Sequence, residues 1–139
     1  MGNSKQLLVA LFLSLALFGC GSSQPILQSI TVQQQPSVDF PQFTASGTYS
    51  NGAHVSPLAV SWVNTGSPVM VVARPPYALN SAPFAPQCVG GQASVVAIAP
   101  ANPRAPSSGS IPQNDWIALT NGSAQSGGFV AGRAQAACQ

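Results

Sequence analysis

The chain has 139 residues, of which 45% are hydrophobic, so it can bury the core of one domain rather than remain disordered. Charged residues make up only 4%, against about 25% in an average globular protein, and the formal net charge is +2. After Lys5 the basic residues Arg74, Arg104 and Arg133 stand far apart, which excludes the clustered basic patch that nucleic-acid binding requires.

The N-terminal segment is typical of an export signal. Lys5 precedes an apolar run from Leu7 to Phe18 that only Ser14 interrupts. This run of about 12 residues is too short for a membrane-spanning helix, which needs roughly 20, but it has the length of a signal-peptide core. We therefore predict a cleaved signal peptide over residues 1–19.

The sequence "LFGC", Leu17 to Cys20, resembles the lipobox of bacterial lipoproteins, with Leu three residues before the cysteine and Gly directly before it. The resemblance implies diacylglyceryl transfer to the Cys20 thiol, cleavage after Gly19 and acylation of the new N-terminus. Two or more acyl chains hold a protein stably in a bilayer. We expect an exported protein that is anchored in the cell envelope through Cys20, with residues 20–25 as its tether. Because Gly21 rather than Asp follows the cysteine, the resemblance implies the outer membrane if the source is Gram-negative.

Alternation of apolar and polar residues predicts half-buried strands after residue 25. Ile30 and Val32 lie on one face of the first such segment, and "NG" at Asn51 and Gly52 favours a hairpin or tight corner after the second. Thirteen Pro and thirteen Gly also favour short strands joined by turns, and no helix is expected. The predicted strands lie within residues 27–36, 41–50, 58–66, 69–73, 90–101 and 127–139.

The order of these segments resembles bacterial immunoglobulin-like domains of the group 2 type. The segments that carry the likeness are "LQSITV", "FTASGTYSNG", "VSWVNTG" and "GGQASVVAIA", which lie between Ile26 and Ala101. The resemblance implies an all-β, immunoglobulin-like two-sheet sandwich over residues 26–139. Two proline-rich segments depart from the pattern, Arg74–Pro86 and Ala101–Trp116. Proline cannot donate a hydrogen bond to a strand ladder, and we interpret the second segment as a long exposed loop.

The two tryptophans differ in their surroundings. Trp62 alternates with Val60 in a strand pattern, which predicts a core anchor over which the sheets pack. Trp116 follows Asp115 at the end of a polar, proline-rich segment, and both a core position and a surface or partner contact remain open for it.

The cysteine count is odd, at three. With Cys20 lipidated, Cys88 and Cys138 remain, and export would place both in an oxidising compartment. Cys138 shares a strand face with Ala136 and Ala134, so it should point inward. We predict a Cys88–Cys138 disulfide. A metal site is disfavoured because His54 is the single histidine and sits in a predicted turn.

The sequence contains few side chains that could act as a general acid or base in catalysis. A serine nucleophile would need His54 as base with Asp39 or Asp115 to orient it, and no "GxSxG" sequence is present. We predict no catalytic residues, no metal and no cofactor, and hence a non-catalytic, lipid-anchored module that binds a protein or glycan partner or has a structural role. Two alternatives remain: a carbohydrate-binding or adhesion module using Trp116, Tyr77 and Phe84, and a small envelope hydrolase using His54.

Overall fold

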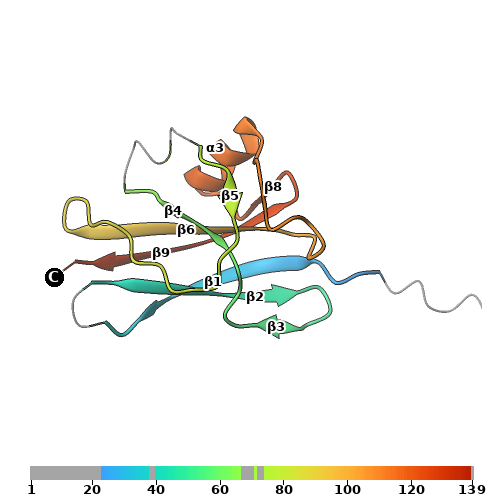
Figure 1. The fold of residues 1–139 in the computed structure, drawn as a ribbon, viewed down its shortest axis with the longest axis horizontal. Coiled ribbons are helices and arrows are strands. Elements are labelled where there is room, and N and C mark those ends of the chain that lie inside the picture. The colour runs from blue at the N-terminus through green and yellow to red at the C-terminus, as the bar shows by residue number, and fades with distance from the viewer. Residues whose placement is uncertain (1–22, 38–39, 67–70, 72–73, 139) are drawn as a thin grey trace, which may run out of the picture.

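The computed structural model describes residues 23–37, 40–66, 71 and 74–138, and these residues form a mostly β structure with one helix. Three antiparallel sheets have the strand orders β1-β2-β3, β4-β6-β9-β8 and β5-β7 (Figure 1). In chain order the elements are β1 (Leu27–Gln35), β2 (Gln42–Tyr49), β3 (His54–Val55), β4 (Ser61–Asn64), β5 (Tyr77–Ala78), β6 (Gln92–Pro100), β7 (Ser108–Gly109), α3 (Gln113–Asn121), β8 (Gln125–Ser126) and β9 (Phe129–Ala137).

The two larger sheets face each other across a shared apolar core. Small side chains let them approach closely: a Cβ at Gly132 of β9 would meet the backbone carbonyl oxygen of Ile30 in β1. Burial of each Val, Leu or Ile here stabilises the fold by about 1.5–3 kcal/mol. The buried members of this core are Leu27, Ile30, Ala45, Leu58, Val60, Ala97, Ala99 and Val130.

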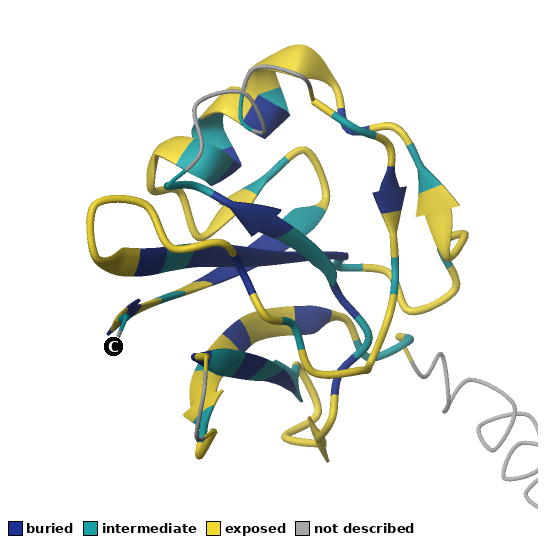
Figure 2. Ribbon diagram, turned by 60° about the vertical axis from the view of Figure 1, so that its left-hand side comes forward, coloured by how far each residue is buried: buried dark blue, intermediate teal, exposed yellow. Residues whose placement is uncertain are grey.

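The sheet that contains β6 is covered on its second face as well. Helix α3 and the short β5-β7 pair pack there, and Figure 2 shows the helix, this sheet and the β1-β2-β3 sheet as successive layers. Strand β6 is therefore buried on both faces: Ala97 and Ala99 face the first core, and Val96 and Ile98 face the second. The second core consists of Val63, Tyr77, Val96, Ile98, Ile111, Trp116, Leu119 and Ala131.

Most of the predicted strands are confirmed. Residues 27–36 contain β1, 41–50 contain β2, 58–66 contain β4, 90–101 contain β6 and 127–139 contain β9. The Asn51-Gly52 turn is also present: Gly52 has a φ of 82° and donates its N–H to the Tyr49 carbonyl, and the chain then enters β3. The signal peptide predicted over residues 1–19 lies outside the described residues. Of the strand predicted over residues 69–73 only Val71 is described, and its backbone is helical rather than extended.

The structure corrects two expectations about the chain after residue 100. Residues 113–121 form helix α3, although no helix was expected. The long exposed loop expected over Ala101–Trp116 is present only in part: residues 102–110 are largely exposed, but the segment also contains β7, the buried Ile111 and the start of α3. The helix follows Pro112, whose fixed φ suits a helix start, and it ends before Gly122, which has a φ of 131°. Helix α3 is too short to span a membrane, and no other described helix is long and apolar enough to do so.

Candidate functional site

The described part of the chain begins three residues after Cys20, so the lipidation site itself lies outside the described residues, as does Asp39. The chain is held firmly from Ile26 onward. The Ile26 N–H donates to the Ser50 hydroxyl at 3.0 Å, and the Ile26 carbonyl accepts the Ser50 N–H at 2.8 Å. The Leu27 N–H donates to the Ala101 carbonyl at 2.8 Å. The domain is therefore attached to any N-terminal anchor at the end where β1 begins and β6 ends.

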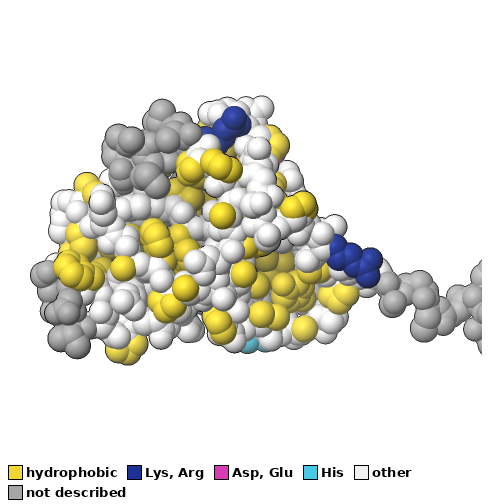
Figure 3. Space-filling view, in the orientation of Figure 1, with side chains coloured by type: hydrophobic (Ala, Val, Ile, Leu, Met, Phe, Trp, Pro, Cys, Tyr) yellow, Lys and Arg dark blue, Asp and Glu magenta, His cyan; other side chains and the backbone are white. Residues whose placement is uncertain are grey.

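An apolar groove with a volume of about 400 Å³ opens at this same end of the domain. Figure 3 shows hydrophobic side chains gathered in a hollow there, with cationic atoms beside it. None of its lining residues is ionisable at neutral pH. They are Leu27, Tyr49, Val55, Pro57, Leu58, Ala59, Leu79, Ser81, Ala99, Pro100, Asn102, Pro103 and Ala105.

Two apolar side chains at or beside the groove are partly exposed to water. Val55 on its wall is 41% exposed, and Ile26, directly before the lining residue Leu27, is 49% exposed. Arg104 lies between the lining residues Pro103 and Ala105, is exposed, and its side chain makes no hydrogen bond to any residue that the structure describes. We call this groove, with Val55 in its lining and with Ile26 and Arg104 adjacent in sequence to its lining residues, the tether-end groove.

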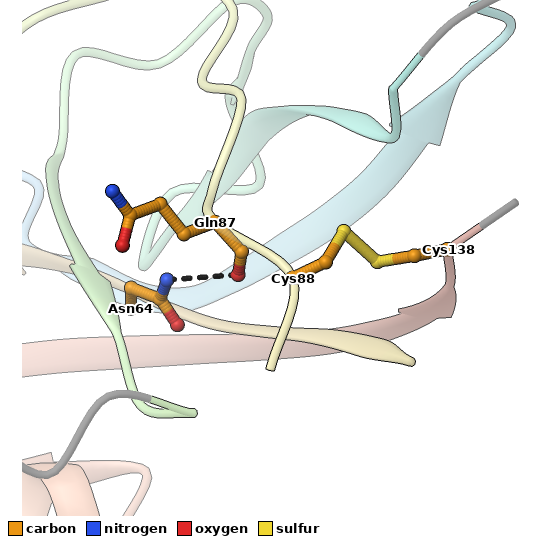
Figure 4. Close-up of a disulfide and its surroundings, with 4 residues drawn as sticks. All are labelled: Asn64, Gln87, Cys88 and Cys138. Atoms are coloured by element: carbon orange, nitrogen blue, oxygen red, sulfur yellow. Dashed lines mark hydrogen bonds between the residues drawn. A yellow bond between two sulfur atoms is a disulfide. The ribbon is translucent and has the colours of Figure 1, made fainter. Parts of the chain in front are cut away.

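The opposite end of the domain carries the predicted Cys88–Cys138 disulfide (Figure 4). The two Cα atoms are 6.2 Å apart, and the bond links residues separated by 50 positions. It connects the segment before β6 to the residue after β9, where the Cys138 N–H also donates to the Gly91 carbonyl at 2.9 Å. The bond therefore fixes the C-terminal end of the chain, which would otherwise be free to fray.

The segment that carries Cys88 is also held by a buried amide. Asn64, at the end of β4, donates from Nδ2 to the Gln87 carbonyl at 3.0 Å, and its Oδ1 accepts the Gly66 N–H at 3.1 Å (Figure 4). Buried polar groups are costly unless they are hydrogen-bonded, and both functions of this amide are satisfied. Asn64 thus positions Cys88 for its bond to Cys138, a role that sequence reasoning missed.

Trp62 lies partly buried between core clusters and contacts residues of two of them. Its indole stacks on Phe84, with ring centroids 5.5 Å apart and planes inclined by 5°. The Phe84 backbone in turn exchanges hydrogen bonds of 2.9 Å with Phe43 in both directions. The buried Nε1 of Trp62 has no hydrogen-bond partner among the described residues. Trp62 and Phe84 therefore hold the proline-rich segment against the two large sheets.

The surface interpretation of Trp116 is wrong. Trp116 is 3% exposed, and its Nε1 donates to the Val71 carbonyl at 2.7 Å, so its indole is the anchor of α3 on the sheet. Tyr77 is buried as well and donates its hydroxyl to the Pro106 carbonyl at 3.0 Å. Two of the three aromatic residues considered for a glycan platform are thus unavailable to a ligand, because packing of α3 encloses them.

The acid–base residues considered for catalysis lie on different elements. His54 is exposed in β3 and pairs with Thr48 of β2. Asp115 lies in the first turn of α3, where its Oδ1 accepts the Ser126 hydroxyl at 2.7 Å and links the helix to β8. A carboxylate in the first turn also interacts favourably with the helix dipole. Within the described ranges no three His, Cys, Asp or Glu side chains gather as metal ligands.

Arg133 of β9 closes the C-terminal end of α3. Its guanidinium donates to the carbonyl of Leu119, one of those that a helix end leaves without partners, and, at 2.8 Å, to the carbonyl of Ser123 just beyond the helix. Partial desolvation lowers the pKa of the Arg133 guanidinium below its ordinary value. A positive charge at the C-terminal end of a helix also interacts favourably with the negative end of the helix dipole.

We expect replacement of Arg133 by Met to lower the free energy of unfolding by about 1 kcal/mol, since two charge-assisted hydrogen bonds at a partly exposed site are lost. Urea denaturation measures this change. Arg104→Met is the matched control, because it removes an exposed guanidinium that makes no hydrogen bond to a described residue. Equal stability of the two variants would contradict a capping role for Arg133.

Fold and site together define a disulfide-closed antiparallel β domain with one packed helix and an apolar groove at the end where β1 begins. Comparisons of the chain with known protein families, curated proteins and solved structures found no match. The function must therefore be argued from the residues of this chain.

Proposed function

We propose that the protein is a non-catalytic, lipid-anchored component of a bacterial cell envelope whose immunoglobulin-like domain acts as a binding or structural module. The observation that carries the proposal is the sequence Leu17–Cys20 after an apolar segment of signal-peptide length, followed within six residues by the start of a folded, disulfide-closed β domain. Diacylglyceryl transfer to Cys20 and cleavage after Gly19 would leave the domain on a short acylated tether.

The immunoglobulin-like assignment has support in the packing of the two large sheets, with β1 and β2 on one side and β4, β6 and β9 on the other. Helix α3 and the β5-β7 pair would then be additions on the outer face of the second sheet. The separation of His54 from Asp115 supports the non-catalytic role. His54 lies in the β2–β3 ladder opposite Thr48, and Asp115 accepts a hydrogen bond from Ser126.

The anchor and the disulfide would lie at opposite ends of the domain. A nine-residue strand such as β9 spans about 30 Å, because each residue advances by roughly 3.3 Å. The Cys88–Cys138 end would therefore project from the membrane by about this distance, where a protein or glycan partner in the envelope can reach it.

Replacing Cys20 with Ala should remove the protein from the membrane fraction without unfolding its domain, since Cys20 lies outside the packed β structure. Fractionation with an alkaline wash measures the location, and the intact mass of the purified wild-type membrane form shows whether a diacylglyceryl group and an extra acyl chain are present. Asn64→Ala is a useful control, because it disturbs the domain and should leave the anchor in place.

A wild-type mass that corresponds to the unmodified, full-length chain would refute the lipid anchor. Membrane attachment of the Cys20→Ala variant equal to that of the wild type would indicate instead that the uncleaved apolar segment holds the protein.

A further inference from the structure

We propose that the tether-end groove is a docking surface that rests on an anionic phospholipid bilayer, so that the domain is held in one orientation on the membrane. This inference depends on the proposed lipid anchor at Cys20 and adds to it a second, weaker contact made by the folded domain.

The length of the tether brings this surface to the bilayer. Cys20 and Ile26 are six residues apart, and an extended chain advances by at most about 3.6 Å per residue, so the tether spans roughly 20 Å. Ile26 is fixed to Ser50 by two hydrogen bonds, and Leu27 lines the groove. Anchoring at Cys20 therefore keeps the groove within one domain radius of the lipid headgroups, at high local concentration.

The apolar side chains of the groove fit the boundary between headgroups and acyl chains. Val55 of the lining and Ile26, next to the lining residue Leu27, are about half exposed to water, and the walls are formed largely by Leu, Pro and Ala. Removing exposed apolar side chains such as these from water is favourable. A bilayer already present beside the groove would bury Ile26 and Val55 with little further loss of translational freedom.

The charges near the groove are complementary to anionic lipid. Arg104, next in sequence to two lining residues, is exposed, and the lining contains no carboxylate. The described acidic residue, Asp115, lies on α3 and is hydrogen-bonded to Ser126 of β8. A basic residue near an anionic surface adds roughly tenfold or less to binding, which suffices to orient a domain that is already tethered.

A second apolar hollow makes a useful contrast. It is lined by Phe40, Ala85, Pro86, Gln87 and Cys88, and thus lies beside the disulfide at the far end of the strands. No arginine is adjacent in sequence to its lining residues, whereas Arg104 lies between two lining residues of the tether-end groove. This second hollow is a full strand length of about 30 Å from the tether attachment at Ile26. Exposed apolar residues are therefore found at both hollows. The tether-end groove differs in its short distance from the proposed anchor and in the positive charge of the neighbouring Arg104.

The test uses the mature lipidated protein, reconstituted into vesicles of phosphatidylcholine and phosphatidylglycerol, recovered by flotation and labelled with hydroxyl radicals. The chain offers matched internal controls. Ile26 (49% exposed) is compared with Ile117 (45%) on α3, and Val55 (41%) with Val89 (46%) near the disulfide. If the groove rests on lipid, Ile26 and Val55 should be labelled several-fold less than their partners of the same type.

The variant that combines Val55→Asp with Arg104→Glu should raise the labelling of Ile26 to that of Ile117, while the protein still floats with the vesicles. Val55 and Arg104 are both exposed, so the variant should keep the fold. If the variant does not fold, the comparison of labelling within the two wild-type residue pairs still tests the proposal. Ile117→Asp is the matched control and should leave Val55 protected.

Equal labelling within both wild-type pairs on floated vesicles overturns the docking proposal and leaves the lipid anchor intact. Protection that persists in the double variant also overturns it, because the groove would then be covered without the apolar Val55 and the cationic Arg104. Failure of the wild-type protein to float refutes the anchor itself, and the docking proposal with it.

Discussion

Loss of the Cys88–Cys138 disulfide should destabilise the domain by about 4 kcal/mol. Closing a loop of 50 residues lowers the entropy of the unfolded chain by this amount in the chain-entropy relation. A domain of this size has a total stability of about 5–15 kcal/mol, so Cys138→Ala removes a large share of it and should lower Tm by roughly 15 °C. The segment around Cys88 keeps the Asn64 hydrogen bond, the Trp62–Phe84 stack and the backbone hydrogen bonds between Val89 and Gln92, so the variant should still fold.

The measurement is urea or thermal denaturation of Cys88→Ala, Cys138→Ala and the double variant. Because one covalent bond is lost in each case, all three should be destabilised to a similar degree, and the effects of the single changes should not add. Reduction of the wild type should reproduce the loss. Additive effects, or a loss below about 1 kcal/mol in either single variant, would show that the bond contributes little.

Trp116→Ala should have an effect of comparable size, about 3–5 kcal/mol, because truncation of a buried tryptophan leaves a large cavity. The indole is 3% exposed between α3 and the sheet, and its Nε1 hydrogen bond to the Val71 carbonyl is also lost. Helix α3 has only nine residues and is too short to persist without this packing. We therefore expect the helical signal in circular dichroism to fall together with the unfolding midpoint.

Two matched variants separate the causes. Trp116→Phe keeps most of the apolar contact and loses the hydrogen bond, so it should cost about 1–3 kcal/mol. Ile117→Ala changes the next residue of the same helix, which is 45% exposed, and should cost less than about 1 kcal/mol. A Trp116→Ala variant as stable as Ile117→Ala would contradict the role of Trp116 as the anchor of α3.

Local sequence patterns determined most of the strand framework. Alternating residues predicted β1 and β2: in β1 the buried Ile30 is next to the exposed Thr31, and in β2 Phe43 and Ala45 are buried whereas Thr44 between them is partly exposed. Asn51-Gly52 predicted the turn between β2 and β3, where Gly52 adopts a positive φ. Alternation along β9 predicted that Cys138 points inward. Its pairing with Cys88 was predicted from the cysteine count, because an assignment of Cys20 to lipidation leaves these two cysteines.

The helix was missed although three signals were present. Pro112 precedes it, Gly122 follows it, and Trp116 and Leu119 are spaced by three residues on one face. These signals were outweighed by the proline and glycine content of the surrounding segment. The continuous apolar sequence of β6 was a further indication, because a strand with apolar residues on both faces requires a cover on both.

Sequence alone thus determined most of the strands and the turn, because each depends on residues that are neighbours in the chain or alternate along one strand. It also predicted the disulfide, through the number of cysteines rather than through a local pattern. It also raised the expectation of a lipid anchor at Cys20, through the four residues Leu17–Cys20. Only the tertiary structure decided that Trp116 and Tyr77 are buried, that Asn64 and Arg133 donate to carbonyls of other segments, and that the groove opens at the end where β1 begins. The hydrogen bonds that these four side chains donate join residues 10 to 45 positions apart in the chain, and no local sequence pattern predicts such contacts.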